Sequence, residues 1–133
     1  MRSTLWTVGI AVGLCAGAAQ AATTHTIKIY DDRFQPANIT IDQGDSVKWA
    51  WQDTWIGHGT KSLSGLDESW DSGLKFSGSF TYLFDTPGIY PYYSPGGNTY
   101  ELMGELVGPM QGQITVVPAS TPEPASLGVL AVG

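Results

Sequence analysis

Apolar and polar side chains alternate one by one along most of this 133-residue chain, and this alternation limits what the chain can fold into. Successive side chains of a β-strand point to opposite faces of its sheet, so a period of two is typical of half-buried strands. The apolar members of these runs are Ile27, Ile29, Ile39, Ile41, Val47, Trp49, Trp51, Phe80, Tyr82, Phe84, Tyr90, Tyr92, Ile114 and Val116. Turn sequences such as Pro87-Gly88 separate the runs. Seven or so short strands at this spacing predict an all-β fold, an antiparallel Greek-key sandwich of two sheets.

The first 21 residues have the features of a secretory signal peptide. Arg2 gives a short basic start, an apolar stretch follows, and Ala19-Gln20-Ala21 is an A-x-A cleavage sequence. The apolar stretch is too short to span a bilayer, which disfavours the alternative of an N-terminal membrane anchor. Cys15, the one cysteine of the chain, lies in this segment, so the exported domain is expected to have no disulfide and no thiol.

The charge balance argues against nucleic acid as a partner. The chain has 6 basic and 12 acidic residues, a net charge of −6, and removal of the signal peptide takes Arg2 away. An acidic domain without a basic stripe repels phosphate backbones and anionic membrane surfaces. We therefore expect no nucleic-acid partner, and a membrane contact only through a C-terminal anchor if the chain continues.

Several stretches resemble the small blue-copper proteins of the plastocyanin and azurin type, the cupredoxins. They are "RFQPANITIDQGDSVKWAW" (33–51), "HGTKS" (58–62), "WDSGLKFSGSFTYLF" (70–84), "PGIYPYY" (87–93) and "MQGQITV" (110–116). The likeness runs from Thr24 to Val117 and implies a cupredoxin-like domain over residues 22–117. In that family the role is electron transfer.

The resemblance also implies a ligand set. Cupredoxins hold copper with two histidines, a cysteine thiolate and a weak methionine, because thiolate and thioether are soft ligands. His58 matches the first histidine and Met110 the axial methionine. Ser94 stands at the cysteine position and Gly97 at the position of the second histidine.

Matching the local Ser-Pro pair instead shifts the two lost ligand positions by one residue, to Tyr93 and Gly96. In either alignment the thiolate and the second imidazole are absent. A serine hydroxyl stays neutral near pH 7 and cannot replace the thiolate. The resemblance therefore implies a blue-copper scaffold that has lost its blue-copper site.

The long loop 96–109 offers a way to refill that site. Its middle, "YELMGEL", is predicted to form one helical turn. Glu101, Met103 and Glu105 could then fold over His58 and, with Met110, hold copper weakly and without intense colour.

Trp55 and Asp53, just before the histidine, suggest a different ligand. An aromatic ring stacks on the apolar C–H patches of a sugar, and a carboxylate accepts hydrogen bonds from sugar hydroxyls. Trp51 alternates with Trp49 and is predicted to lie in the core, so Trp55 is the aromatic residue expected at the surface.

Residues 118–133 form a proline-rich linker followed by an apolar start. Pro122, Glu123 and Pro124 resemble the opening of a PEP-CTERM sorting signal, cut short before its helix and basic end. Such signals are processed at the bacterial envelope, and their carriers are often linked with exopolysaccharide. The resemblance implies location in the periplasm, at the cell surface or in the extracellular matrix.

Three functions follow from these features. The first is a non-redox binding or structural module that contacts envelope polysaccharide or another exported protein, with no cofactor. The second is a copper protein with an altered, colourless site at His58, Met110 and the 96–109 loop. The third is a copper electron carrier typical of the family. No nucleophile-and-base pair stands out in the sequence, so we do not expect an enzyme.

Overall fold

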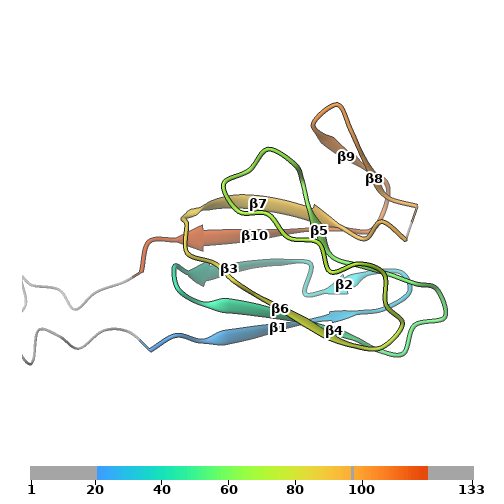
Figure 1. Ribbon diagram of the computed structural model, residues 1–133, viewed down its shortest axis with the longest axis horizontal. Coiled ribbons are helices and arrows are strands. Elements are labelled where there is room, and N and C mark those ends of the chain that lie inside the picture. The colour runs from blue at the N-terminus through green and yellow to red at the C-terminus, as the bar shows by residue number, and fades with distance from the viewer. Residues whose placement is uncertain (1–20, 97, 120–133) are drawn as a thin grey trace, which may run out of the picture. The chain divides into compact units, whose positions relative to one another are not determined.

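A computed structural model describes residues 21–96 and 98–119, and Ala22–Pro118 form one compact unit within it. This unit contains strands β1 (Thr24–Ile29), β2 (Phe34–Gln35), β3 (Asn38–Asp42), β4 (Ser46–Trp51), β5 (Lys61–Ser62), β6 (Gly78–Leu83), β7 (Gly88–Tyr93), β8 (Tyr100–Leu102), β9 (Glu105–Val107) and β10 (Gln111–Val117) (Figure 1). The predicted signal peptide, residues 1–21, lies outside the described part except for Ala21, and so does the predicted tail, residues 118–133, except for Pro118 and Ala119. Within that part no helix is long and apolar enough to cross a membrane.

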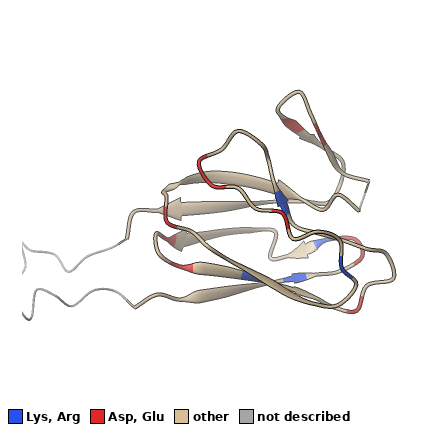
Figure 2. Ribbon diagram, in the orientation of Figure 1, with Lys and Arg blue, Asp and Glu red and all other residues tan. Residues whose placement is uncertain are grey.

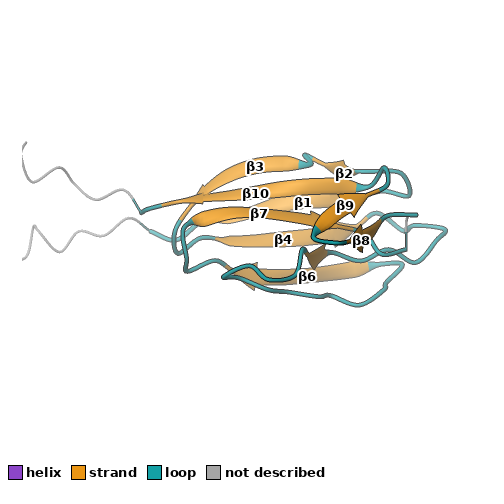
Figure 3. Ribbon diagram, turned by 90° about the horizontal axis from the view of Figure 1, so that it is seen from above, coloured by secondary structure: helices purple, strands orange, loops and turns teal. Residues whose placement is uncertain are grey.

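The strands form two four-stranded sheets and a separate hairpin (Figures 1 and 3). One sheet has the order β2-β1-β4-β6 and the other β3-β10-β7-β5, while β8 pairs only with β9 among the described strands. The predicted all-β sandwich of two sheets is confirmed.

The sequence predicted antiparallel pairing of the strands, and this prediction is wrong for two of the strand pairs. Strand β1 runs parallel to β4, and β3 runs parallel to β10. A parallel pair needs a crossover between its strands, and in both cases the intervening chain includes at least one strand of the other sheet. The remaining pairs are antiparallel.

Aromatic side chains fill the space between the two sheets. Trp49 is fully buried, stacks on Trp70 at a ring-centroid distance of 5.5 Å and meets the edge of Tyr92 at 5.6 Å. Trp70 in turn lies edge-on to Phe84 at 5.2 Å. Aromatic pairs of this kind contribute about 0.5–1.5 kcal/mol each beyond the area they bury. In a domain without a disulfide, this cluster is a major source of stability.

The alternation that predicted the strands also predicted this core. Every second residue of β4, namely Val47, Trp49 and Trp51, is buried, and so are Ile27 and Ile29 of β1. Trp51 therefore lies in the core, as predicted.

Candidate functional site

His58 lies outside the main strands yet is fully buried, and both its backbone and its ring make hydrogen bonds. Its N–H donates to the Lys75 carbonyl at 3.0 Å, and its carbonyl accepts from the Lys75 N–H at 2.8 Å. The same carbonyl accepts a bond from the indole Nε1 of Trp51 at 2.8 Å. Residues 58–60 are buried, although they lie in the stretch between strands β4 and β5.

Ser94 meets the imidazole directly. Its Oγ lies at hydrogen-bond distance from His58 Nδ1, 3.0 Å away, and accepts a bond from the Gly59 N–H at 3.2 Å. Ser94 is itself fully buried. Of the two positions expected for the lost thiolate, Ser94 rather than Tyr93 is thus the one hydrogen-bonded to His58.

Asp31, which was not predicted from the sequence, faces Nε2 of the His58 ring. Its Oδ1 lies 3.3 Å from His58 Nε2, close enough for an electrostatic contact, although Nε2 makes no hydrogen bond in the described structure. The carboxylate also accepts the backbone N–H groups of Trp55 and Ile56 at 2.9–3.0 Å. The bonds from Trp55 and then Ile56 hold the pKa of Asp31 below its ordinary value, with the contact to His58 adding to them.

Met110 lies next to Ser94, immediately before β10. Its N–H donates to Thr99 Oγ1 at 2.8 Å, and its carbonyl accepts the Ser94 N–H at 3.2 Å. The side chain is buried and belongs to the hydrophobic core between the sheets. A thioether packs well in such an irregular gap, so burial alone does not make Met110 a ligand.

The residues present do not fit a blue-copper centre. His58 Nδ1 already has the Ser94 hydroxyl as a partner. Among residues 21–96 and 98–119, no three His, Cys, Asp or Glu side chains are grouped so that they could hold a metal. Gly97 lies outside the described residues. At Gly96, the alternative position for the second histidine, an added Cβ would run into the Gly57 carbonyl oxygen.

The loop that was expected to refill the site is a β-hairpin, so the predicted helical turn is wrong. Met103 and Gly104, between β8 and β9, have φ angles of 52° and 84°. Positive φ at both central residues is the geometry of the type I′ turn, one of the turns that close two-residue hairpins. Glu101 binds the backbone N–H and hydroxyl of Ser64, and Met103 is 95% exposed. Neither side chain covers the buried His58.

Asp31, His58 and Ser94 together form an acid–imidazole–hydroxyl series that resembles a nucleophilic relay. Both His58 and Ser94 are 0% exposed, however, so a substrate has no route to the Ser94 oxygen in this structure. The Oγ is also held by the Gly59 N–H. The series binds loops together: Ser94 joins the chain after β7 to that after β4, and Asp31 adds the chain after β1.

Trp55 is the most exposed aromatic residue near this series, at 91%. It borders a hollow of about 360 Å³ that is lined by Asp53, Thr54, Trp55, Phe76 and Ser77. The Thr54 N–H donates to the Phe76 carbonyl at 2.9 Å, which ties the two sides of the hollow together. Trp55 and Asp53, predicted from sequence as ligand contacts, therefore share one hollow with a second aromatic ring. Phe76 was missed because it follows Trp55 by 21 positions with no local pattern linking them.

The backbone beneath Trp55 is fixed. Its N–H and that of Ile56 both donate to the Asp31 carboxylate. Ile56, Leu74 and Phe76 are also more than half exposed. These exposed apolar side chains lie beside a backbone that Asp31 holds in place, and the Asp53 carboxylate lines the neighbouring hollow.

Comparisons with known proteins agree with the fold. No family model matches the chain. Mouse fibrocystin-L is 35% identical over 98 residues, which cover 65% of this chain and only 2% of that protein. The chain therefore spans a very small part of that relative.

Solved structures give the clearer likeness. A reduced Cu(I) amicyanin variant at pH 4 superposes with a TM-score of 0.55 and 18% identity, over 77% of this chain and 88% of that one. The copper-containing nitrite reductase of Thermus scotoductus gives a TM-score of 0.59 at 19% identity, over 76% of this chain and 24% of that enzyme. A purple cupredoxin from Nitrosopumilus maritimus gives 0.53 at 22%, over 70% and 99%. This chain has the cupredoxin fold.

Proposed function

We propose that this chain is an exported, non-redox binding module that uses a cupredoxin scaffold to hold envelope polysaccharide. The observation that carries the proposal is the bond between Ser94 Oγ and His58 Nδ1. A neutral hydroxyl occupies the bonding direction of the imidazole, and both groups lie inside the protein. We infer that the polar pair links two loops inside the protein, and that the outer surface of the domain binds the ligand.

The face proposed for the ligand is the hollow beside Trp55. A ring that is 91% exposed offers a flat apolar surface to a sugar, and the backbone that carries it needs little ordering because Asp31 already holds it. Asp53 and Ser77 line the same hollow and can hydrogen-bond to hydroxyl groups. We propose neither a catalytic activity nor a cofactor.

Two other functions remain as outcomes of the tests. Another exported protein would use the exposed apolar group of Ile56, Leu74 and Phe76 as well as Trp55. A colourless copper site, or a copper electron carrier, would require His58 to exchange Ser94 for the metal.

Binding should be tested by affinity electrophoresis and calorimetry of the domain 22–118 with neutral and anionic polysaccharides from bacterial envelopes. We expect Trp55→Ala to weaken binding at least tenfold, which corresponds to about 1.4 kcal/mol. Tyr100→Ala is the matched control, because Tyr100 is another exposed aromatic residue, at 52%, on the hairpin. Equal binding by wild type and Trp55→Ala would contradict the proposed contact.

A further inference from the structure

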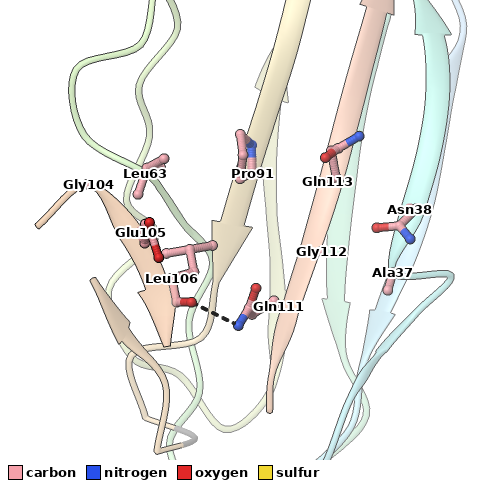
Figure 4. A pocket seen from close by; sticks show the side chains of 10 residues that line it. All are labelled: Ala37, Asn38, Leu63, Pro91, Gly104, Glu105, Leu106, Gln111, Gly112 and Gln113. Carbon is pink, nitrogen blue, oxygen red and sulfur yellow. Dashed lines mark hydrogen bonds between the residues drawn. The ribbon is translucent and has the colours of Figure 1, made fainter. Parts of the chain in front are cut away.

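A second hollow, of about 510 Å³, lies between the hairpin turn and the outer face of the sheet β3-β10-β7 (Figure 4). Gly104, Glu105 and Leu106 form its wall on the hairpin side. Its volume falls in the range of small-molecule sites, roughly 300–1,000 Å³. None of the family-related residues at His58 takes part in it.

The floor of this hollow is a cross-strand row. Gln113 of β10 pairs with Asn38 of β3 on one side and with Pro91 of β7 on the other. All three line the hollow, so two side-chain amides and a proline ring lie side by side (Figure 4). Within the described residues the Asn38 side-chain amide has no hydrogen bond, and the Gln113 side-chain amide makes only a 3.5 Å contact with the Thr115 hydroxyl.

The row continues along the sheet. A neighbouring hollow of about 290 Å³ is lined by Asn38, Gln113, Ile39, Thr40 and Thr115, so the two hollows share Asn38 and Gln113. Thr115 pairs with Thr40 in the next outward-facing position, two residues along each strand. Such positions repeat about every 6.6 Å. An amide row is thus followed by a hydroxyl row on one continuous strip.

The wall is held in place from both sides. Gln111 Nε2 donates to the Gly108 carbonyl at 2.7 Å and reaches the Leu106 carbonyl at 3.4 Å, which ties the hairpin to β10. On the other side Glu101 binds Ser64. A wall fixed in this way requires little ordering when a ligand enters.

The chemistry of the strip points to an uncharged ligand rich in hydroxyl groups. Amides and hydroxyls both donate and accept, which suits neighbouring sugar hydroxyls, whereas neither attracts a charged group. Glu105 is the one charged residue in the lining of either hollow. The acidic residues are spread over several loops and the hairpin (Figure 2), so the domain as a whole repels anionic chains.

We propose that this strip, which we call the amide groove (Asn38, Thr40, Gln113 and Thr115 with the wall residue Leu106), binds a neutral glycan segment. The inference rests on the proposed function, because it names the class of polysaccharide and adds a contact surface separate from Trp55. Leu106 and Pro91 supply apolar surface for sugar C–H groups, and the amides bind the hydroxyls.

The test uses the domain 22–118 with two soluble neutral polysaccharides, a glucan and a mannan, and with alginate as the anionic comparison. We expect the double variant Asn38→Ala/Gln113→Ala to bind the neutral chains at least tenfold more weakly, since both side-chain amides that would bind the sugar hydroxyls are lost. Gln52→Ala removes an exposed amide outside the groove and should bind like wild type. Thermal unfolding of each variant checks that the fold is intact.

A second variant, Leu106→Asp, adds charge to the wall without touching the sheet and should weaken neutral-glycan binding as well. Neutral-glycan binding that is lost in Trp55→Ala but unchanged in both groove variants would overturn the amide groove and leave the proposed function standing. Binding of alginate alone would also overturn it. Absence of binding to any polysaccharide would overturn both proposals.

Discussion

Ser94 Oγ and His58 Nδ1 come from segments 36 residues apart and lie 3.0 Å from each other in the protein interior. Each of the two groups is the hydrogen-bond partner of the other, and the Ser94 hydroxyl also accepts a bond from the Gly59 N–H. Buried polar groups of this kind cost little when paired and a great deal when one partner is removed. The pair can therefore be tested through stability, independently of any ligand.

Ser94→Ala should lower the free energy of unfolding by about 1–3 kcal/mol, because it leaves His58 Nδ1 and the Gly59 N–H buried without a partner. Urea denaturation followed by tryptophan fluorescence measures this change. The control is Ser79→Ala on the exposed face of β6, which should stay within about 0.5 kcal/mol of wild type. Equal stability of the two variants would contradict the link between the two loops.

Gly96→Ala should destabilise the domain by about 1–3 kcal/mol, because its Cβ would collide with the Gly57 carbonyl. Gly57→Ala is the matched control: the nearest atoms to its added Cβ are Phe76 and Leu74 side-chain carbons at 3.5–3.7 Å, which is ordinary contact. Differential scanning calorimetry of the two variants compares them directly. A similar cost for both would mean that the loop after β7 does not pack on residue 57 as described.

The stability of the domain should fall in acid. Burial raises the pKa of Glu68, but bonds from Tyr82 and from the backbone of Asp85 and Thr86 outweigh it and hold the pKa below its ordinary 4.5. A carboxylate with a depressed folded-state pKa stabilises the fold above its unfolded-state pKa, and this contribution disappears as pH falls through the folded value. Unfolding free energy should thus be flat near pH 6–7 and decline below about 4.5.

Glu68→Gln isolates this contribution. Its amide cannot supply two acceptor oxygens to the groups that Glu68 binds, so the variant should be less stable at pH 7 and have a shallower decline in acid. Asp45 and Asp31 also have lowered pKa values and will keep part of the decline. An unchanged pH profile in Glu68→Gln would refute the role given to this carboxylate.

Substitution of Trp55 and of Trp49 should change the free energy of unfolding by very different amounts. Trp55→Ala removes a side chain that is 91% exposed and should change stability by no more than about 0.5 kcal/mol. Trp49→Ala empties the centre of the aromatic core and should cost about 3–5 kcal/mol. Chemical denaturation measures both. A large loss for Trp55→Ala would assign that residue to the fold rather than to binding.

The sandwich could be predicted because alternation is local. A burial period of two is visible in any five residues of β4 or β10, and it correctly placed Trp51 in the core. The parallel pairs β1–β4 and β3–β10 were missed, because pairing direction depends on how the chain crosses between sheets. The hairpin was misread as a helical turn, since the positive φ of Met103 leaves no signature in a short acidic and apolar stretch.

The candidate site could be predicted only in part. Resemblance pointed to His58, Ser94 and Met110 as neighbours of a lost metal, and the structure joins the first two by a side-chain bond and the last two through the backbone. Asp31 and Phe76 were missed, because each reaches its partners from more than 20 residues away. The amide groove was missed because its residues stand on three strands and form a row only once the register is known.

The central claim is that this cupredoxin fold works without copper, and calorimetric titration of the domain 22–118 tests it most directly. Cu(II), and Cu(I) under a reductant, should be added to wild type and to His58→Ala. We predict only weak uptake that is the same in both proteins. One-to-one binding tighter than about a micromolar, near −8 kcal/mol, that disappears in His58→Ala would contradict the claim and restore a copper function.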